Sequence, residues 1–163
     1  MTITLIIGAS SLIAKRLRDN LLSQGHPVVA ISRQAADVKH TQLHWIECDQ
    51  TPDAIDRACK EIENLTQPIS RVCIFTAVLH SEAFMPEKRL EDVNFEQLAL
   101  SFQINTNLPL LWLSKLIPQL NNMQHRSLSK ISIAVLSARV GSIEDNRLGG
   151  WYSYRASKAA LNM

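Results

Sequence analysis

Tyr154 and Lys158 are the residues whose types and spacing could most directly do chemistry. They stand four positions apart in a run of good helix formers, so both side chains should lie on one face of a helix. A free phenol ionises near pH ~10, but an ammonium group beside it favours the phenolate and lowers the pKa of the tyrosine. A tyrosine tuned in this way can act as a general acid/base near neutral pH. The pair therefore predicts a site of proton transfer.

Asn105 is a second candidate, because Pro109 follows it by four positions within a helix predicted over residues 93–120. Proline has no N–H, so the carbonyl of Asn105 loses the donor that a helix normally provides. A freed carbonyl in a cleft is a natural site for a bound water. A proline kink that only serves packing is the alternative.

A loop at the other end of the chain could bind phosphate. An apolar run over residues 2–7 leads into Gly8, and leucines at helical spacing follow from residue 12. Gly8 permits a tight turn, and the free N–H groups at the start of the helix attract the pyrophosphate of a dinucleotide. Leu12 and Ala14 stand where dinucleotide loops usually carry glycine, so a plain strand–turn–helix is the alternative.

Ser32 and Arg33 follow the second apolar run and bear on which dinucleotide would bind. An acidic group at this position holds the ribose hydroxyls of NAD, whereas an arginine accommodates the 2′-phosphate of NADP. The pair favours NADP(H), with a merely solvated Arg33 as the alternative. Asp49 follows the third run, where it could meet the adenine or cap the next helix.

The elements that must position these residues alternate between strands and helices. Strands are predicted at residues 2–7, 28–32, 43–48, 72–75 and 131–136, and helices begin near residues 12, 52 and 93 and around Tyr154. This alternation, with strands that are continuous apolar runs, predicts a three-layer, doubly wound α/β fold of the Rossmann type with a mostly parallel sheet. A length of 163 residues predicts one domain over residues 1–163.

Composition excludes several classes of protein. The net charge is +2 and the basic residues are scattered, which argues against a nucleic-acid partner. No apolar run is long enough to span a membrane, and no basic segment precedes the first apolar run as in a signal peptide. Three widely spaced cysteines predict reduced thiols and a cytoplasmic location. His40 and His44 lack further ligands nearby, so no metal site is predicted.

Along nearly all of its length the chain resembles the short-chain dehydrogenase/reductase family. The resemblance is carried by residues 8–14, Ser32-Arg33, Asp49, Phe75-Thr76-Ala77, Asn105, residues 137–143 and Tyr154 with Lys158. The sequence from Gly141 to Lys158 is most similar to that of the carbonyl-reductase-like branch, which includes the C-factor signalling proteins. The resemblance implies an NADP(H)-dependent oxidoreductase that interconverts a small carbonyl compound and an alcohol, assembled as a homodimer or homotetramer.

The family's residue roles carry over by position. Tyr154 would exchange a proton with the substrate oxygen, Lys158 would lower its pKa and bind the nicotinamide ribose, and Asn105 would hold a relay water. Ala138 stands where the substrate-binding serine normally lies, so Ser137 is the candidate for that role and Ser142 the alternative. The cofactor-binding residues that the resemblance implies are Gly8, Ser10, Ser11, Leu12, Ile13, Ser32, Arg33, Asp49, Ala77, Tyr154 and Lys158.

Two departures from the family pattern leave other hypotheses open. Ala138 replaces the usual serine, and Phe75-Thr76-Ala77-Val78 replaces the usual Asn-Asn-Ala-Gly, so a catalytically silent Rossmann module with a signalling role is the alternative. Family members usually continue with two more strands and a substrate-covering loop. The resemblance therefore implies a chain that is incomplete after Met163, whether natural or a fragment, with strands 1–5 visible and little reductase activity on its own.

Overall fold

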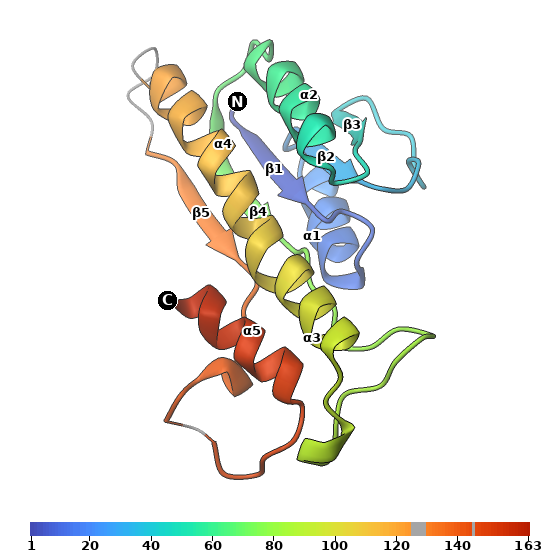
Figure 1. Cartoon of the computed structure of the whole chain (residues 1–163). Helices are drawn as coiled ribbons and strands as arrows, with labels where there is room; N and C mark the ends of the chain where they lie inside the picture. The colour runs from blue at the N-terminus through green and yellow to red at the C-terminus, as the bar shows by residue number, and fades with distance from the viewer. Residues whose placement is uncertain (125–129, 145) are drawn as a thin grey trace. The chain divides into compact units, whose positions relative to one another are not determined.

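Five parallel strands form one sheet in the order β3-β2-β1-β4-β5 (Figure 1). The structure is a computed structural model that describes residues 1–124, 130–144 and 146–163. The strands are β1 (Ile3–Ile7), β2 (Val28–Ser32), β3 (Leu43–Glu47), β4 (Ile69–Ile74) and β5 (Ser132–Val135). Because β2 and β4 flank β1 on opposite sides, the chain reverses its direction of winding beside β1. Ligands of such sheets bind at the carboxyl ends of the strands near this reversal.

Helices cover both faces of the sheet. Figure 1 shows α2 (Pro52–Glu63) and α4 (Leu108–Gln124) in front of the strands and α1 (Leu12–Ser23) behind them. Ile6 and Ala30, from neighbouring strands, share a buried cluster with Leu21 of α1. On the other face, Trp112 of α4 donates to Gln50 at 2.7 Å, just before α2. The predicted doubly wound fold is confirmed.

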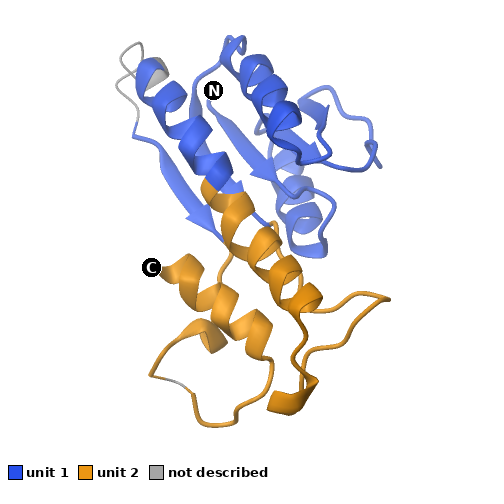
Figure 2. Ribbon diagram, in the orientation of Figure 1, with its two compact units in different colours: residues 1–75, 111–135 blue, residues 76–110, 136–163 orange. Residues whose placement is uncertain are grey.

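The chain divides into two compact units (Figure 2). Unit 1, residues 1–75 and 111–135, contains the sheet. Unit 2, residues 76–110 and 136–163, contains the short helices η1 (Leu90–Asp92) and η3 (Arg139–Gly141), together with α3 (Phe95–Phe102), η2 (Gln103–Asn107) and α5 (Tyr152–Asn162). The dinucleotide loop therefore belongs to unit 1 and the tyrosine–lysine pair to unit 2. The expected single domain over residues 1–163 stays a prediction.

The helix predicted over residues 93–120 differs from the structure at its centre. It is divided into α3, the π-helical η2 and α4. In η2 the N–H of Leu108 donates to the carbonyl of Gln103, five residues earlier. Pro109 comes next and supplies no N–H, so regular α-helical bonding cannot run through this turn. Such π turns are frequent at functional sites.

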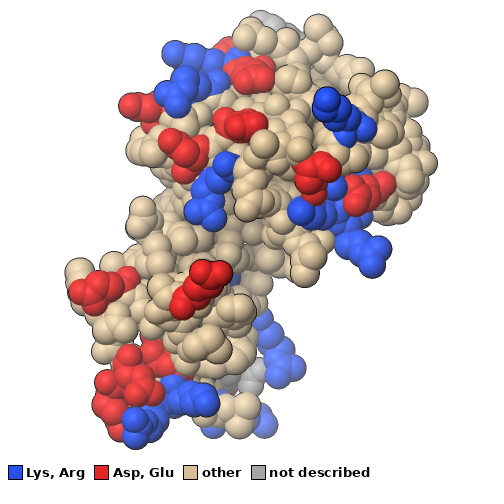
Figure 3. Space-filling model, turned by 90° about the vertical axis from the view of Figure 1, so that its right-hand side faces the viewer, with Lys and Arg blue, Asp and Glu red and all other residues tan. Residues whose placement is uncertain are grey.

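The other expectations from composition concern surface charge, cysteines and membrane spans. On the face shown in Figure 3, basic and acidic side chains are interspersed. The three cysteines are free, and burial raises the pKa of each thiol, that of Cys59 to about 11. Within the described ranges, the longest and most apolar helices fall short of what a membrane span needs.

Candidate active site

The loop between β1 and α1 has the geometry of a phosphate-binding turn. Gly8 has φ +81°, a left-handed conformation that favours glycine. The N–H groups of Gly8 and Ala9 both donate to the carbonyl of Ile31 at 3.0 Å, which ties the loop to the end of β2. Ser11 then caps α1 by accepting from the N–H of Ala14 at 3.3 Å.

The start of α1 fits a bound dinucleotide. Leu12 and Ile13 are its first two residues, and their side chains leave the residues 83% and 57% exposed. Backbone N–H groups in a first helical turn have no acceptor within the helix. Exposed apolar side chains beside free donors suit a ligand that has both an apolar ring and a phosphate. Leu12 stands where dinucleotide-binding loops usually carry glycine, and its side chain adds apolar surface there.

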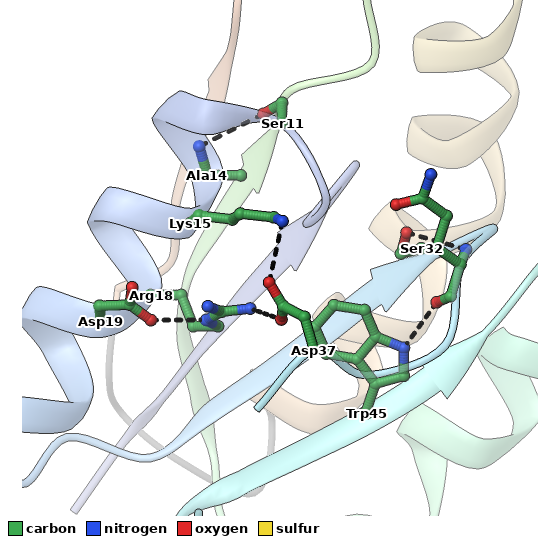
Figure 4. A network of polar contacts seen from close by, with 9 residues as sticks. Ser11, Ala14, Lys15, Arg18, Asp19, Ser32, Asp37 and Trp45 are labelled. Atoms are coloured by element: carbon green, nitrogen blue, oxygen red, sulfur yellow. Dashed lines mark hydrogen bonds and ion pairs between the residues drawn. The ribbon is translucent and has the colours of Figure 1, made fainter. Parts of the chain in front are cut away.

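Charged side chains join α1 to the segment after β2 (Figure 4). The guanidinium of Arg18 is buried, contacts Asp37 at 2.5 Å and Asp19 at 2.8 Å, and lies 6.0 Å from the centroid of the Trp45 ring. Lys15 contacts the other oxygen of Asp37 at 2.9 Å. Hydrogen bonds from Lys15 and Arg18 lower the pKa of Asp37 to about 2. Asp37 therefore already pairs with two cations of α1.

Arg33 differs from these two cations in its surroundings. It is exposed at the carboxyl end of β2, and no hydrogen bond or ion pair holds it among the residues that the structure describes. The preceding Ser32 is buried, and its hydroxyl accepts from the N–H of Gln34 at 3.1 Å. An exposed guanidinium without a protein partner suits recognition of a phosphate.

Asp49 has a local role in the structure. Its Oδ1 accepts from both the N–H of Thr51 at 3.0 Å and the hydroxyl of Thr51 at 2.7 Å. The backbone hydrogen bond is the main reason why the pKa of Asp49 is lowered. Thr51 in turn caps α2. The structure thus favours the helix-start alternative for Asp49, and contact with an adenine stays a prediction.

In unit 2, α5 brings Tyr154 and Lys158 together. The Nζ of Lys158 lies 5.9 Å from the centroid of the Tyr154 ring. Lys158 is fully buried, and its ammonium donates to the carbonyl of Leu136 at 2.8 Å. Trp151 stacks edge-on against Tyr154, with the ring centroids 6.4 Å apart. A phenol and a buried ammonium therefore lie near one another, as their spacing predicts.

The pKa values of this pair differ from the expectation. Burial raises the pKa of Tyr154 above its ordinary value of 10.0, whereas a lowered value was expected. Burial also lowers the pKa of Lys158 from 10.5 to about 8. The expectation was wrong because it considered only the charge of an ammonium beside the phenol and not the burial of both groups. In the structure the ammonium bonds a backbone carbonyl, and desolvation acts on both groups.

Asn105 is the fully buried centre of η2 and links two segments of unit 2. Its Oδ1 accepts from the N–H of Val78 at 2.7 Å, and its Nδ2 donates to the carbonyl of Val78 at 2.9 Å and to the hydroxyl of Ser157 at 3.0 Å. The sequence pointed only to its backbone carbonyl and missed these side-chain bonds. A relay water on that carbonyl stays a prediction.

The segment bound by Asn105 also contains Thr76 and Ala77. The hydroxyl oxygen of Thr76 is buried without a hydrogen-bond partner among the described residues, and Ala77 is exposed. An orphaned buried hydroxyl suits a site that a water or ligand completes. Ala77 as a cofactor contact stays a prediction.

The hydroxyl of Ser137 is hydrogen-bonded to the last residue of α5. It donates to Oδ1 of Asn162 at 2.5 Å. Asn162 is eight residues after Tyr154, which places it about 12 Å further along the helix. The Ser137 hydroxyl therefore has a partner at the end of α5, and its role as the substrate-binding serine stays a prediction.

Gly141 allows η3 to approach α5 at Lys158. A Cβ at Gly141 would lie 2.8 Å from both the carbonyl carbon and the Cβ of Lys158. We therefore expect Gly141→Ala to lower the free energy of unfolding by about 1–3 kcal/mol, measured by chemical denaturation. At an unstrained site with free space, replacing glycine by alanine normally stabilises a protein by about 0.4–1 kcal/mol. Stabilisation by Gly141→Ala would therefore contradict the close approach of η3 to α5. Gly25→Ala gives a comparison, because there a Cβ meets nothing within 4 Å and the cost comes from a φ of +74°, a left-handed conformation that Gly141 does not have.

Comparison with known proteins gives matches along the chain. No protein-family model matches it. It is 28% identical over 166 residues to 1-hydroxy-2-glutathionyl-2-methyl-3-butene dehydrogenase of Rhodococcus sp. (strain AD45), covering 100% of this chain and 68% of that protein. It is 28% identical over 165 residues to benzil reductase ((S)-benzoin forming) of Bacillus subtilis (strain 168), covering 100% and 64%. A stretch of 74 residues is 40% identical to the C-signal of Myxococcus xanthus, covering 45% of this chain and 42% of that protein.

Solved structures have the same fold. Carbonyl reductase Sniffer of D. melanogaster matches with a TM-score of 0.86 and 25% identity, covering 99% of this chain and 71% of that one. An NADPH-bound carbonyl reductase from chicken fatty liver matches with a TM-score of 0.83 and 24% identity, covering 100% and 68%. The chain thus spans roughly two thirds of the length of the first two curated relatives and of these structures.

Proposed function

We propose that this chain is a member of the short-chain dehydrogenase/reductase family, on its carbonyl-reductase-like side, and that it is an NADP(H)-dependent oxidoreductase that interconverts a carbonyl compound and an alcohol. The observation that carries the proposal is the placement of Tyr154 beside the buried ammonium of Lys158 on α5. Two relatives that align with the whole chain are a dehydrogenase and a reductase by name. A small-molecule substrate, a homodimer or homotetramer and a cytoplasmic location belong to the same proposal.

Tyr154 is the acid in the direction of reduction. Its raised pKa keeps the phenol protonated at neutral pH, so it can donate a proton to the carbonyl oxygen. A bound nicotinamide supplies the hydride to the carbonyl carbon in that direction and accepts it in the reverse one. Lys158, with a pKa of about 8, is mostly charged at neutral pH and stabilises the phenolate that proton donation leaves. Asn105 holds the segment at Val78 and α5 in place around these two groups.

Residues of unit 1 would hold the phosphate groups of the cofactor. The N–H groups of Leu12 and Ile13, with the Gly8 turn and the hydroxyls of Ser10 and Ser11 nearby in sequence, suit the pyrophosphate. Arg33 suits the 2′-phosphate that distinguishes NADP from NAD, since Lys15 and Arg18 already pair with Asp37.

The cofactor preference can be measured by fluorescence titration. We expect NADPH to bind more tightly than NADH. Arg33→Ala should weaken the binding of NADPH about 10- to 100-fold, because a charged hydrogen bond is lost, and should have little effect on the binding of NADH. Lys39→Ala removes another exposed cation after β2 and should leave both affinities unchanged. Equal affinities of the unsubstituted chain for NADPH and NADH would refute the role of Arg33.

The reaction itself is tested with aldehydes and ketones at high protein concentration. NADPH oxidation and alcohol formation are followed together, with chromatographic detection so that slow turnover is measured. Alcohol formed in proportion to NADPH consumed supports the proposal. NADPH binding without turnover of any carbonyl or of the corresponding alcohols would favour the catalytically silent module.

A further inference from the structure

The catalytic helix α5 begins without a cap of its own. Trp151 occupies the N-cap position with φ 52°, and its side chain accepts no hydrogen bond from the helix. Gly149 and Gly150, just before it, also have positive φ, so three successive residues are left-handed. The N–H groups of a first helical turn need acceptors from elsewhere when the cap residue supplies none.

Glu87 supplies these acceptors from a distant part of unit 2. It is 3% exposed, although glutamate is seldom buried unless paired. One carboxylate oxygen accepts from the hydroxyl of Ser153, and the other lies 3.4 Å from the N–H of Ser153, the second residue of α5. The backbone carbonyl of Glu87 also accepts from the N–H of Trp151 at 2.6 Å. Negative charge at a helix N-terminus is favourable.

The approach of Glu87 to this turn leaves little room. A Cβ at Gly150 would lie 3.2 Å from the carbonyl oxygen of Glu87. The left-handed conformation and the missing side chain of Gly150 therefore let the chain pass close to Glu87 before α5 starts. Both the backbone and the side chain of Glu87 thus hold the beginning of the helix.

A second clamp holds α5 one turn later. Ser157 accepts from Asn105, and its carbonyl accepts from the hydroxyl of Thr106 at 2.8 Å. Ser153 and Ser157 are both fully buried and lie four residues apart, on one face of α5. Each directly precedes one residue of the proposed acid/base pair, Tyr154 and Lys158. Two clamps at this spacing fix both the rotation of the helix and its position along the axis.

We propose that Glu87 is a positioning residue for Tyr154, because its carboxylate caps the start of α5 through Ser153 in place of the N-cap side chain. This inference rests on the proposed function, because it gives Glu87 a part in the same reaction. Glu87 does not touch the reacting atoms. It sets where the phenol stands, and a misplacement of about 1 Å is enough to cost about 100-fold in rate.

The test compares Glu87→Ala, which removes the acceptor, with Glu87→Gln, which keeps an acceptor oxygen. In the alanine variant we expect amide hydrogen exchange in the first turn of α5 to quicken about tenfold, and kcat to fall about 10- to 100-fold with KM for NADPH within about twofold. The glutamine variant should restore kcat to within about threefold of the unsubstituted chain. Glu91→Gln, an exposed carboxylate of η1, is the matched control and should change neither measurement.

A spectroscopic readout keeps the test independent of turnover. The chain has two tyrosines, so [13Cζ]-tyrosine labelling gives two resonances, and Tyr154→Phe assigns that of Tyr154. Glu87→Ala should move or broaden the Tyr154 resonance. If the alanine variant does not fold, Ser153→Ala removes the donor side of the same cap and should quicken exchange similarly.

The possible results separate the two proposals. Unchanged exchange and an unchanged Tyr154 resonance in Glu87→Ala would overturn the inference, as would a glutamine variant as impaired as the alanine one. If exchange and resonance respond while the unsubstituted chain reduces no carbonyl, the capping by Glu87 stands and the proposed function fails.

Discussion

Replacing Tyr154 by phenylalanine should lower the rate of NADPH-dependent carbonyl reduction by about 10²- to 10⁴-fold, the usual contribution of a positioned general acid. The substitution removes one hydroxyl group, and no hydrogen bond of that hydroxyl holds the described part of the chain together. The fold, the contact with Trp151 and NADPH binding should therefore persist. The loss should appear in kcat, measured by alcohol formation under saturating NADPH.

Tyr152→Phe is the matched control for this loss. Tyr152 lies two residues earlier on α5 and is the other tyrosine of the chain, but it is not part of the proposed site. Its variant should keep its activity within about twofold, since most substitutions outside such sites are nearly neutral. Equal turnover in Tyr154→Phe and the unsubstituted chain would show that the phenol carries no proton in the reaction.

Replacing Lys158 by methionine should make the protein more stable at neutral pH while it abolishes catalysis. The pKa of Lys158 is about 8 in the folded chain and 10.5 for an ordinary lysine, so burial of the charged form costs about 3 kcal/mol below pH 8. Removing the ammonium relieves this cost but also removes its hydrogen bond to the carbonyl of Leu136, which lowers the stability by about 1 kcal/mol. The net expectation is about 2 kcal/mol of added stability at pH 7, measured by urea denaturation.

The stability difference between the two proteins should change with pH in a definite direction. Between pH 8 and 10.5 the unfolded chain holds a proton on Lys158 that the folded chain has released, so the stability of the unsubstituted protein rises with pH. The advantage of the methionine variant should therefore shrink over this range and vanish near its upper end. Buried thiols such as Cys59 titrate in both proteins and cancel in the difference. A difference that is constant from pH 7 to 10 would contradict a lowered pKa of Lys158.

Lys115→Met provides the control for this comparison. Lys115 pairs with Asp56 at 2.8 Å on a partly exposed surface, and this carboxylate raises its pKa. Its replacement should leave the stability unchanged or lower it only slightly, because ion pairs at an exposed surface contribute little. Stabilisation by both substitutions would point to a general benefit of methionine rather than to relief of a buried charge.

Much of the fold could be predicted from local sequence, because the strands are continuous apolar runs and the helices carry their own signals. The predicted strand over residues 28–32 matches β2, and Ser11 and Thr51 cap α1 and α2 as their residue types favour. The pairing of Tyr154 with Lys158 could be predicted for the same reason, since four residues in a helix fix a geometry.

What escaped prediction depends on contacts between segments distant in sequence. Glu87 and Ser153 lie 66 residues apart, and nothing in the local pattern marks a glutamate in a loop as the cap of a later helix. The raised pKa of Tyr154 escaped because it follows from burial. Asn105 was found through Pro109, a local signal, but its bonds to Val78 and Ser157 were not.

The π turn at η2 can be regarded as a one-residue insertion within an otherwise regular helix. Each residue of an α-helix turns the chain by about 100°, so deleting one residue before Asn105 would regularise the helix and carry the Asn105 side chain about a quarter of the way around it. That side chain would then face away from Val78 and Ser157. The irregular turn therefore determines which way the Asn105 side chain faces. Shortening it would improve the helical hydrogen bonding but would remove the hydrogen bonds by which Asn105 holds α5.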